Sequence, residues 1–158
     1  MKILAIDPGS TQSGFVVIDE QYKPLDFGKI DNDKILDLIH MVPDEITVVI
    51  EMVASLGMSV GQTIFDTCVW IGRFEQLSIE LNLPVTKVFR KEVKMNLCGM
   101  MRARDSNIKQ ALVDRFSYER HAAKGGKGIK KDPGFFFGFA ADVWQAYALG
   151  VTYLDNNK

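Results

Sequence analysis

The chain opens with the stretch KILAIDPGS at residues 2–10, an apolar run that ends in an aspartate and a turn. Apolar runs of this length are typical of buried strands, and Pro8 and Gly9 are common turn residues. The stretch therefore predicts a core strand with Asp7 at its end, where a ligand can meet the carboxylate and the nearby backbone. The alternative is a turn aspartate that binds its own backbone.

Further strands and a helix follow within the first fifty residues. Gly14–Ile18 and Leu25–Ile30 are β-rich and joined by short turns, so with the first strand they predict an antiparallel meander. Asp33–Met41 has helical spacing and ends before Pro43. Thr47–Glu51 is fully apolar up to its last residue, which is typical of a central strand. A crossover helix before it favours parallel pairing with the first strand.

The rest of the chain alternates helices and strands. The apolar positions of Val60–Leu81 recur every three or four residues and predict a long amphipathic helix. We then expect a strand at Val85–Phe89, a helix to Phe116 that Asp105 caps, a loop at Tyr118–Gly138 and a last helix at Ala140–Leu154. This order indicates one α/β domain over residues 1–158, with a five-stranded mixed sheet flanked by helices.

Composition excludes several classes of protein. The 158 residues are 47% apolar and 25% charged, which fits a soluble globular domain. No apolar run approaches the ~20 residues that cross a bilayer, and the first residues do not form a signal peptide. We therefore expect a cytoplasmic protein. Cys68 and Cys98 have no metal or redox spacing and are interpreted as reduced packing residues.

The small net charge of −1 hides a segregation along the chain. Residues 1–86 carry 5 basic and 13 acidic side chains, whereas residues 87–131 carry 13 basic and 4 acidic ones. This pattern is expected when one face meets phosphate, although an ordinary solvated surface is the alternative. The candidate DNA contacts are Lys87, Arg90, Lys91, Arg102, Arg104, Lys124, Lys127, Lys130 and Lys131.

Three acids stand at the ends of core elements: Asp7, Glu51 and Asp142. Burying Glu51 without a partner would be costly, unless its strand ends in solvent. Asp142 lies in the first turn of the last helix, where the helix dipole also favours an acid. If the two strands are neighbours and the helix packs on them, the three carboxylates converge. A hard cation such as Mg²⁺ would hold them together.

The segments that carry these acids resemble the motifs of RuvC-type Holliday junction resolvases. DPGSTQSG at 7–14 resembles the first motif, VIE at 49–51 with the following loop and helix resembles the second, and AAD at 140–142 resembles the C-terminal acidic motif. MSVGQ at 58–62 and WIGRF at 70–74 are similar to segments of the short bacteriophage members. The resemblance spans nearly the whole chain, and it implies the cytoplasm of the host cell if a phage encodes the protein.

This resemblance implies a ribonuclease H-like fold and a homodimer that cleaves branched DNA with Mg²⁺ or Mn²⁺. Its substrates would be four-way junctions, with three-way junctions and flaps as further candidates. It assigns metal binding and catalysis to Asp7, Glu51 and Asp142, and a role at the phosphate to Lys94, which is otherwise a plain surface lysine. Phe65, Trp70 and Phe74 would then divide between the core and the dimer seam, unless all pack inside one subunit.

The resemblance also raises two local questions. Family members insert a side chain into the junction from the loop after the second acid, and Met52 or Met58 would do so here unless both simply pack. The cellular enzymes have a fourth acid three residues before the last one, where this chain has Phe139. Asp132 is a candidate replacement, although Pro133 after it indicates an ordinary turn role.

Other functions compete with this interpretation. An actin-like ATPase shares a related fold and an Asp-x-Gly-Ser turn, but needs two such domains, which 158 residues cannot supply. A DNA-junction binder without catalysis is the second alternative, since Phe139 replaces an acid. A nuclease for another structured nucleic acid is the third.

Overall fold

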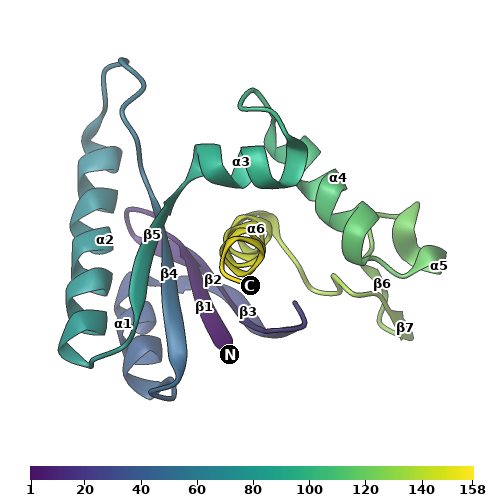
Figure 1. Ribbon diagram of the computed structural model, residues 1–158, viewed down its shortest axis with the longest axis horizontal. Helices are drawn as coiled ribbons and strands as arrows, with labels where there is room; N and C mark the ends of the chain where they lie inside the picture. Colours follow the sequence, from purple (N-terminus) through teal and green to yellow (C-terminus); the bar gives the residue numbers. More distant parts are fainter.

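A five-stranded sheet forms the centre of the computed structural model, which describes all residues from Met1 to Lys158 (Figure 1). The strands are β1 (Lys2–Asp7), β2 (Gln12–Asp19), β3 (Pro24–Asp31), β4 (Ile46–Met52) and β5 (Val85–Phe89), in the spatial order β3-β2-β1-β4-β5. The first three strands are antiparallel, while β4 and β5 run parallel to β1. The expected meander and mixed sheet are confirmed.

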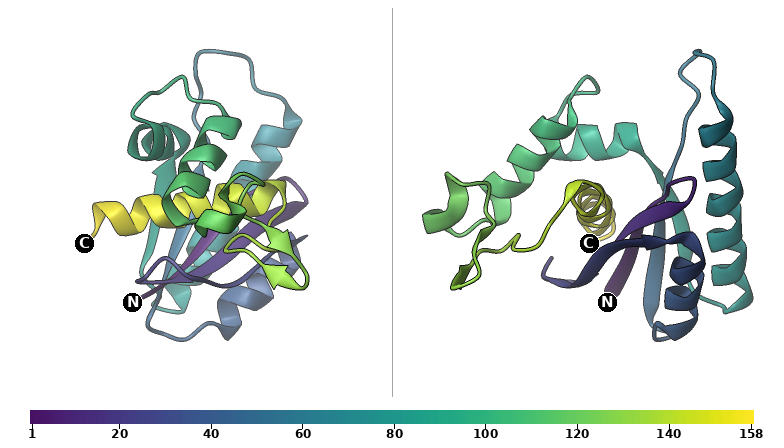
Figure 2. Two further views of the ribbon diagram at one scale, coloured as in Figure 1. Left: turned by 90° about the vertical axis from the view of Figure 1, so that its right-hand side faces the viewer. Right: turned by 180° about the vertical axis from the view of Figure 1, so that it is seen from behind.

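Helices cover both faces of this sheet. They are α1 (Asn32–Met41), α2 (Gln62–Glu80), α3 (Arg90–Cys98), α4 (Asp105–Phe116), α5 (Glu119–Ala122) and α6 (Ala141–Asn156). Helices α1 and α2 lie on one face and α6 on the other, with α3 and α4 passing beyond α6 (Figures 1 and 2). None of these helices has the length and apolar content needed to cross a membrane.

Strand alternation sends neighbouring residues of β1 and β4 to opposite faces of the sheet. The side chains that face α1 and α2 include Leu4, Ile6, Val48 and Ile50, and those that face α6 include Ile3, Ala5 and Val49. The same alternation, continued by one step, turns the side chains of Asp7 and Glu51 toward α6. The sheet thus presents both acids on the face where the last helix packs.

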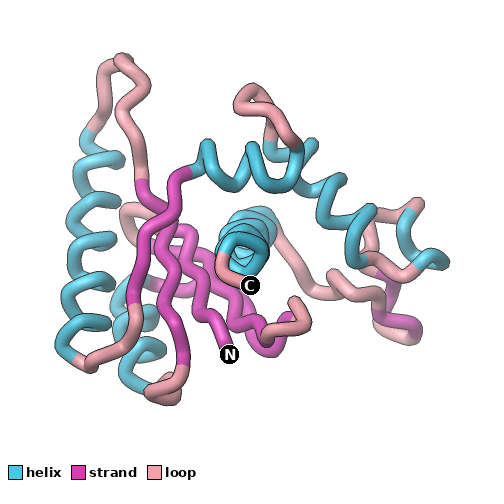
Figure 3. The backbone as a smooth tube through the Cα atoms, viewed as in Figure 1, coloured by secondary structure: helices cyan, strands magenta, loops and turns pink.

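Helix α3 follows β5 without a break and was missed by sequence patterning (Figure 3). Only Val93 of its nine residues is buried, so it has no apolar periodicity to detect. The cap predicted for α4 was also wrong, because Arg104 occupies the capping position and Asp105 is the first helical residue. The backbone N–H of Arg104 donates to Asn107 Oδ1 at 2.8 Å, which caps this end of the helix.

The segment Tyr118–Gly138, predicted as a loop, is ordered by short elements. It contains α5 and a two-stranded sheet of β6 (Gly128–Ile129) and β7 (Asp132–Pro133). Elements of two to four residues carry no periodic signal, which is why the sequence indicated a loop. The segment lies at the end of the molecule farthest from α2 (Figure 1).

Gly14 of β2 sets how closely α6 approaches the sheet. A Cβ atom at this position would lie 2.6 Å from the backbone oxygen of Asp142 and 2.8 Å from its Cβ. The first turn of α6 therefore rests directly on the glycine backbone, which places Asp142 above the β1–β2 pair.

We expect Gly14→Ala to lower the free energy of unfolding by about 1–3 kcal/mol, because the added methyl group pushes α6 away from the sheet. Gly72→Ala on α2 is the matched control, since its new Cβ meets no atom within 4 Å. That variant should gain up to about 1 kcal/mol from helix propensity. Urea unfolding measures both, and a Gly14→Ala protein as stable as the wild type would contradict the close contact.

Candidate metal centre

The two strand acids stand side by side at the carboxyl ends of parallel strands. Ile6 of β1 pairs with Ile50 of β4, so Asp7 and Glu51 each follow by one position. Gly14 lies opposite Asp7 on the other side of β1. A single row across the sheet therefore contains both acids and the glycine on which α6 rests.

The turn after Asp7 is fixed by a buried polar network. Ser13 Oγ donates to Asn32 Oδ1 at 2.5 Å and accepts the backbone N–H of Gly9 at 3.2 Å. Asn32 Nδ2 donates to the backbone oxygen of Gly9 at 2.9 Å. Because Ser13 and Asn32 are each 1% exposed, these bonds are shielded from water and hold the turn against the start of α1.

Asp142 completes the group from α6, which packs on the same face of the sheet, and it is paired with a lysine. Lys29 Nζ on β3 lies 2.5 Å from Asp142 Oδ2. Lys29 stands opposite Gly14 in the sheet, so it belongs to the same row as Asp7. The hydrogen bond to Asp142 raises the pKa of Lys29.

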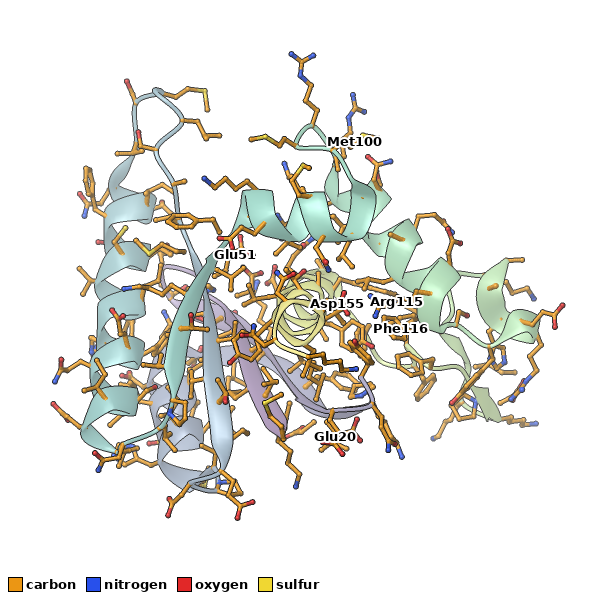
Figure 4. The ribbon with its side chains drawn as sticks, viewed as in Figure 1. Glu20, Glu51, Met100, Arg115, Phe116 and Asp155 are labelled. Atoms are coloured by element: carbon orange, nitrogen blue, oxygen red, sulfur yellow. The ribbon has the colours of Figure 1, made fainter.

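Glu51 is paired with an arginine from the start of α3. Arg90 Nη1 lies 3.3 Å from Glu51 Oε2, and Arg90 Nη2 binds Asp105 of α4. Burial raises the pKa of Glu51, although the positive charges of Arg90 and Lys94 oppose this shift. Figure 4 shows Glu51 where β4 and β5 meet the start of α3.

Asp7 takes part in none of these ion pairs, and its carboxyl group is strongly perturbed. Burial raises the pKa of Asp7 to about 7, and the negative charges of Glu51, Asp142 and Asp105 add to the shift. Four carboxyl groups therefore act on one another here, with the Arg90 guanidinium as the main opposing charge on Asp7. The centre carries more negative charge than its own cations neutralise.

A polar cleft of about 350 Å³ opens beside Asp7 and Asp142. Its other lining residues are Pro8, Gly9, Ser10, Thr11, Gln12, Lys29, Thr63 and Thr67. The hydroxyl and amide groups among them can donate hydrogen bonds to an anionic ligand.

The carboxylates are of the ligand type that suits a hard divalent cation, but their side chains are not arranged around such an ion in this structure. Carboxylate oxygens are the ligands that Mg²⁺ prefers, and such an ion would relieve the repulsion from Glu51 and Asp142 that adds to the effect of burial on the pKa of Asp7. No three His, Cys, Asp or Glu side chains lie close enough to hold an ion in this structure. Asp142 and Glu51 instead point to Lys29 and Arg90, so ion binding requires these two pairs to open.

An aromatic core fills the position where the resemblance would place a fourth acid. Phe139 is 1% exposed, and its ring lies 4.7 Å from Phe27 and 5.2 Å from Phe136 and Trp144, centroid to centroid. Asp132, the candidate replacement, binds Arg120 and His121 in the α5–β7 segment instead. Asp105 is the additional acid whose charge acts on both Asp7 and Glu51.

The predicted DNA contacts divide into engaged and free side chains. Lys87 lies 2.6 Å from Glu75, and Arg90 is held by two acids, so both are occupied within the chain. Lys94 is half-buried and close enough to lower the pKa of Glu51. The others form none of the ion pairs, and all but the half-buried Lys127 are exposed: Lys91, Arg102, Arg104, Lys124, Lys127, Lys130 and Lys131.

Sequence reasoning missed three residues of this centre. Lys29 lies on a weakly patterned strand, and only the β2–β3 register brings it to Asp142. Arg90 looks like one of many basic residues until α3 is known to start there. Asp105 was interpreted as a helix cap, although an acid beside a basic segment is also a signal for an ion pair.

Comparison of structures finds the same fold in a solved protein. The Thermus thermophilus RuvC structure superposes with a TM-score of 0.68 over 99% of this chain and 96% of that chain, at 17% sequence identity. A second structure, T. thermophilus RuvC in complex with Holliday junction substrate, gives 0.67 over 99% and 95%, at 16% identity. By sequence, no family model and no curated protein gives a significant match. The ribonuclease H-like fold expected from the resemblance is confirmed.

We expect Asp7→Asn to be more stable than the wild type at pH 8 in EDTA, by about 1–3 kcal/mol, because a tenfold change in proton affinity corresponds to about 1.4 kcal/mol. Asp7 releases its proton near pH 4 when unfolded and near pH 7 when folded, so stability falls as the pH rises between these values. At pH 4 the two proteins should be similar.

Chemical unfolding between pH 4 and pH 8 measures this difference. Asp44→Asn is the control, because Asp44 is an exposed acid outside the centre. A wild type that loses no stability relative to Asp7→Asn between pH 4 and pH 7 would contradict the electrostatic description of the centre.

Proposed function

We propose that this protein is a divalent-metal-dependent endonuclease that cleaves Holliday junctions and other branched DNA. The observation that carries the proposal is the placement of Asp7, Glu51 and Asp142 on one face of the sheet, where burial and the neighbouring negative charges raise the pKa of Asp7. The likeness in fold to RuvC and the resemblance of the three acidic motifs support the same function.

Asp7, Glu51 and Asp142 would hold Mg²⁺ or Mn²⁺. When bound, such ions supply an activated water and stabilise the leaving oxygen of a phosphodiester. Lys29 and Arg90 neutralise Asp142 and Glu51 in the absence of metal and would exchange these partners for DNA phosphate. We propose Asp105, rather than Asp132, as the acid that compensates for Phe139.

The remaining residues would bind and orient the DNA strand. Lys94 stands beside Glu51 and would neutralise a phosphate oxygen at the edge of the centre. The hydroxyl groups of Ser10, Thr11 and Thr63 line the cleft and would donate to the backbone. The basic side chains of residues 91–131 that form no ion pairs would bind neighbouring phosphates. Such contacts give an affinity that does not depend on base sequence and that falls steeply with salt concentration.

Cleavage of a panel of four-way, three-way, flap and linear DNA in Mg²⁺ or Mn²⁺ tests the proposal. We expect the wild type to cut branched DNA, and Asp7→Asn, Glu51→Gln or Asp142→Asn to reduce the rate by about 100-fold or more, the scale of losing one electrostatic stabiliser. Asp44→Asn should cut normally. Cleavage by Asp7→Asn at the wild-type rate would refute the assignment.

Phe139 favours one alternative, a junction-binding protein without catalysis, because the fourth acid is absent. The two functions differ in metal binding. A nuclease should gain thermal stability from Mg²⁺ or Mn²⁺ in wild type but much less in Asp7→Asn, since the ion relieves repulsion that the variant lacks. Junction binding with neither metal stabilisation nor cleavage would support the alternative.

We also propose a homodimer formed through α2, because symmetric cleavage needs two opposed active sites. Phe74 packs in the core, Trp70 is partly buried, and the exposed apolar residues of α2 include Phe65 at 54% and Val69 at 62% exposure. These exposed residues lie one turn apart and form an apolar stripe on the outer surface of α2.

Light scattering should give twice the chain mass of 17.7 kDa for the wild type at micromolar concentration. Phe65→Ser with Val69→Asp should shift the mass to that of the monomer, because the stripe loses its apolar contact. Ile129→Asp, at an exposed apolar position in β6 far from α2, is the control. A wild-type mass of 17.7 kDa would contradict the dimer.

A further inference from the structure

Two loop tips project from the same side of the molecule. One joins β4 to α2 and the other joins α3 to α4, and every view shows both rising above the sheet (Figures 1 and 2). The first tip carries Leu56 and Met58 at 80% and 72% exposure, and the second carries Met100 and Met101 at 56% and 61%. Four large apolar side chains thus face solvent at the two tips.

The α3–α4 tip is a turn ordered by backbone hydrogen bonds, and its methionines face solvent. Gly99 ends α3 in the left-handed conformation, with φ of 67°, and its N–H donates to Met95 O at 3.0 Å. Ala103 N–H donates to Met100 O at 3.3 Å, and Ala103 is 2% exposed, which anchors the far side of the turn. The exposure of Met100 and Met101 therefore follows from the fold of the turn.

The surroundings of these methionines are basic. Arg102 and Arg104 follow them directly, are exposed, and take part in none of the nine ion pairs of the chain. Met100 projects toward the β4–α2 tip, and Glu51 lies below the space between the two tips in the same view (Figure 4). An apolar tip flanked by arginines fits a ligand that presents apolar faces next to anionic groups.

We propose that Met100 and Met101 form a second base-contacting element, which packs on unstacked bases at the branch point of DNA opposite the β4–α2 tip. This inference rests on the proposed function and concerns how the same site selects its substrate. Arg102 and Arg104 bind the flanking phosphates, while the methionines bury their thioether side chains against base faces. Intact duplex offers no exposed base faces, so the contact favours junctions over linear DNA.

The flanking arginines argue for nucleic acid rather than a second protein as the occupant. Two exposed guanidinium groups without ion-pair partners stand beside the methionines and favour an anionic ligand, which the phosphates of DNA supply. Met52, the other candidate for insertion from the β4–α2 loop, packs partly buried against the α1–α2 side of the core. The first tip therefore contributes Met58, and the second contributes Met100 and Met101.

The test uses the full chain in EDTA, so that binding is measured without cleavage, and a four-way junction with 2-aminopurine at the branch point. Wild-type protein should raise the 2-aminopurine fluorescence as bases unstack. The double variant Met100→Ser with Met101→Ser should lose most of this rise. Its ratio of junction affinity to duplex affinity should fall about tenfold, the size expected for the loss of a buried methionine. Duplex affinity should be unchanged, since the arginines remain.

Met41→Ser is the matched control, because Met41 is 74% exposed at the end of α1, away from both tips. An unchanged unfolding temperature verifies that the double variant is folded. This inference alone is overturned if the double variant keeps the wild-type rise in 2-aminopurine fluorescence and the wild-type preference for junction over duplex. It is also overturned if the two substitutions change only the oligomeric mass. A wild type without any preference for the junction overturns the proposed function together with it.

Discussion

The packing of α6 on a glycine backbone is the constraint on which the rest of the structure depends. Gly14 leaves no room for a side chain beneath Asp142, and further along the helix a Cβ at Gly150 would lie 2.8 Å from Ile18. These two contacts fix the height and direction of α6 above the sheet. Because Gly14 stands opposite Asp7 in the β1–β2 pair, the height of α6 above the sheet also fixes the separation of Asp7 and Asp142.

Electrostatics then decides the state of the centre without metal. Asp7, Glu51 and Asp142 lie partly buried, where separated charges interact more strongly than in water. Lys29 and Arg90 come from β3 and α3, which places one cation on each side of the group. Asp7 lies between them without an ion-pair partner, so burial and the neighbouring negative charges raise its pKa. The fold thus supplies anionic ligands in excess of its internal cations, as a cation site requires.

Most of the sheet could be predicted from the sequence, because its strands are apolar runs bounded by turn residues. The positions of Asp7, Glu51 and Asp142 followed from the ends of those elements. The electrostatic partners could not be predicted, since Lys29 and Arg90 reach the acids only through strand register and through a helix with a single buried residue, Val93. The α5–β7 segment was missed because its order comes from turns and from the Asp132 ion pairs rather than from periodicity.

The aromatic cluster around Phe139 has a consequence for substitutions at this position. A carboxylate introduced there would be enclosed by Phe27, Phe136, Trp144 and Tyr147 and would lose its hydration without gaining a partner. Accommodating an acid at this position would need several neighbouring rings to shrink at the same time. Changing one ring alone would leave a cavity in the core, so single substitutions around Phe139 would lower the stability of the fold before they made room for a hydrated carboxylate.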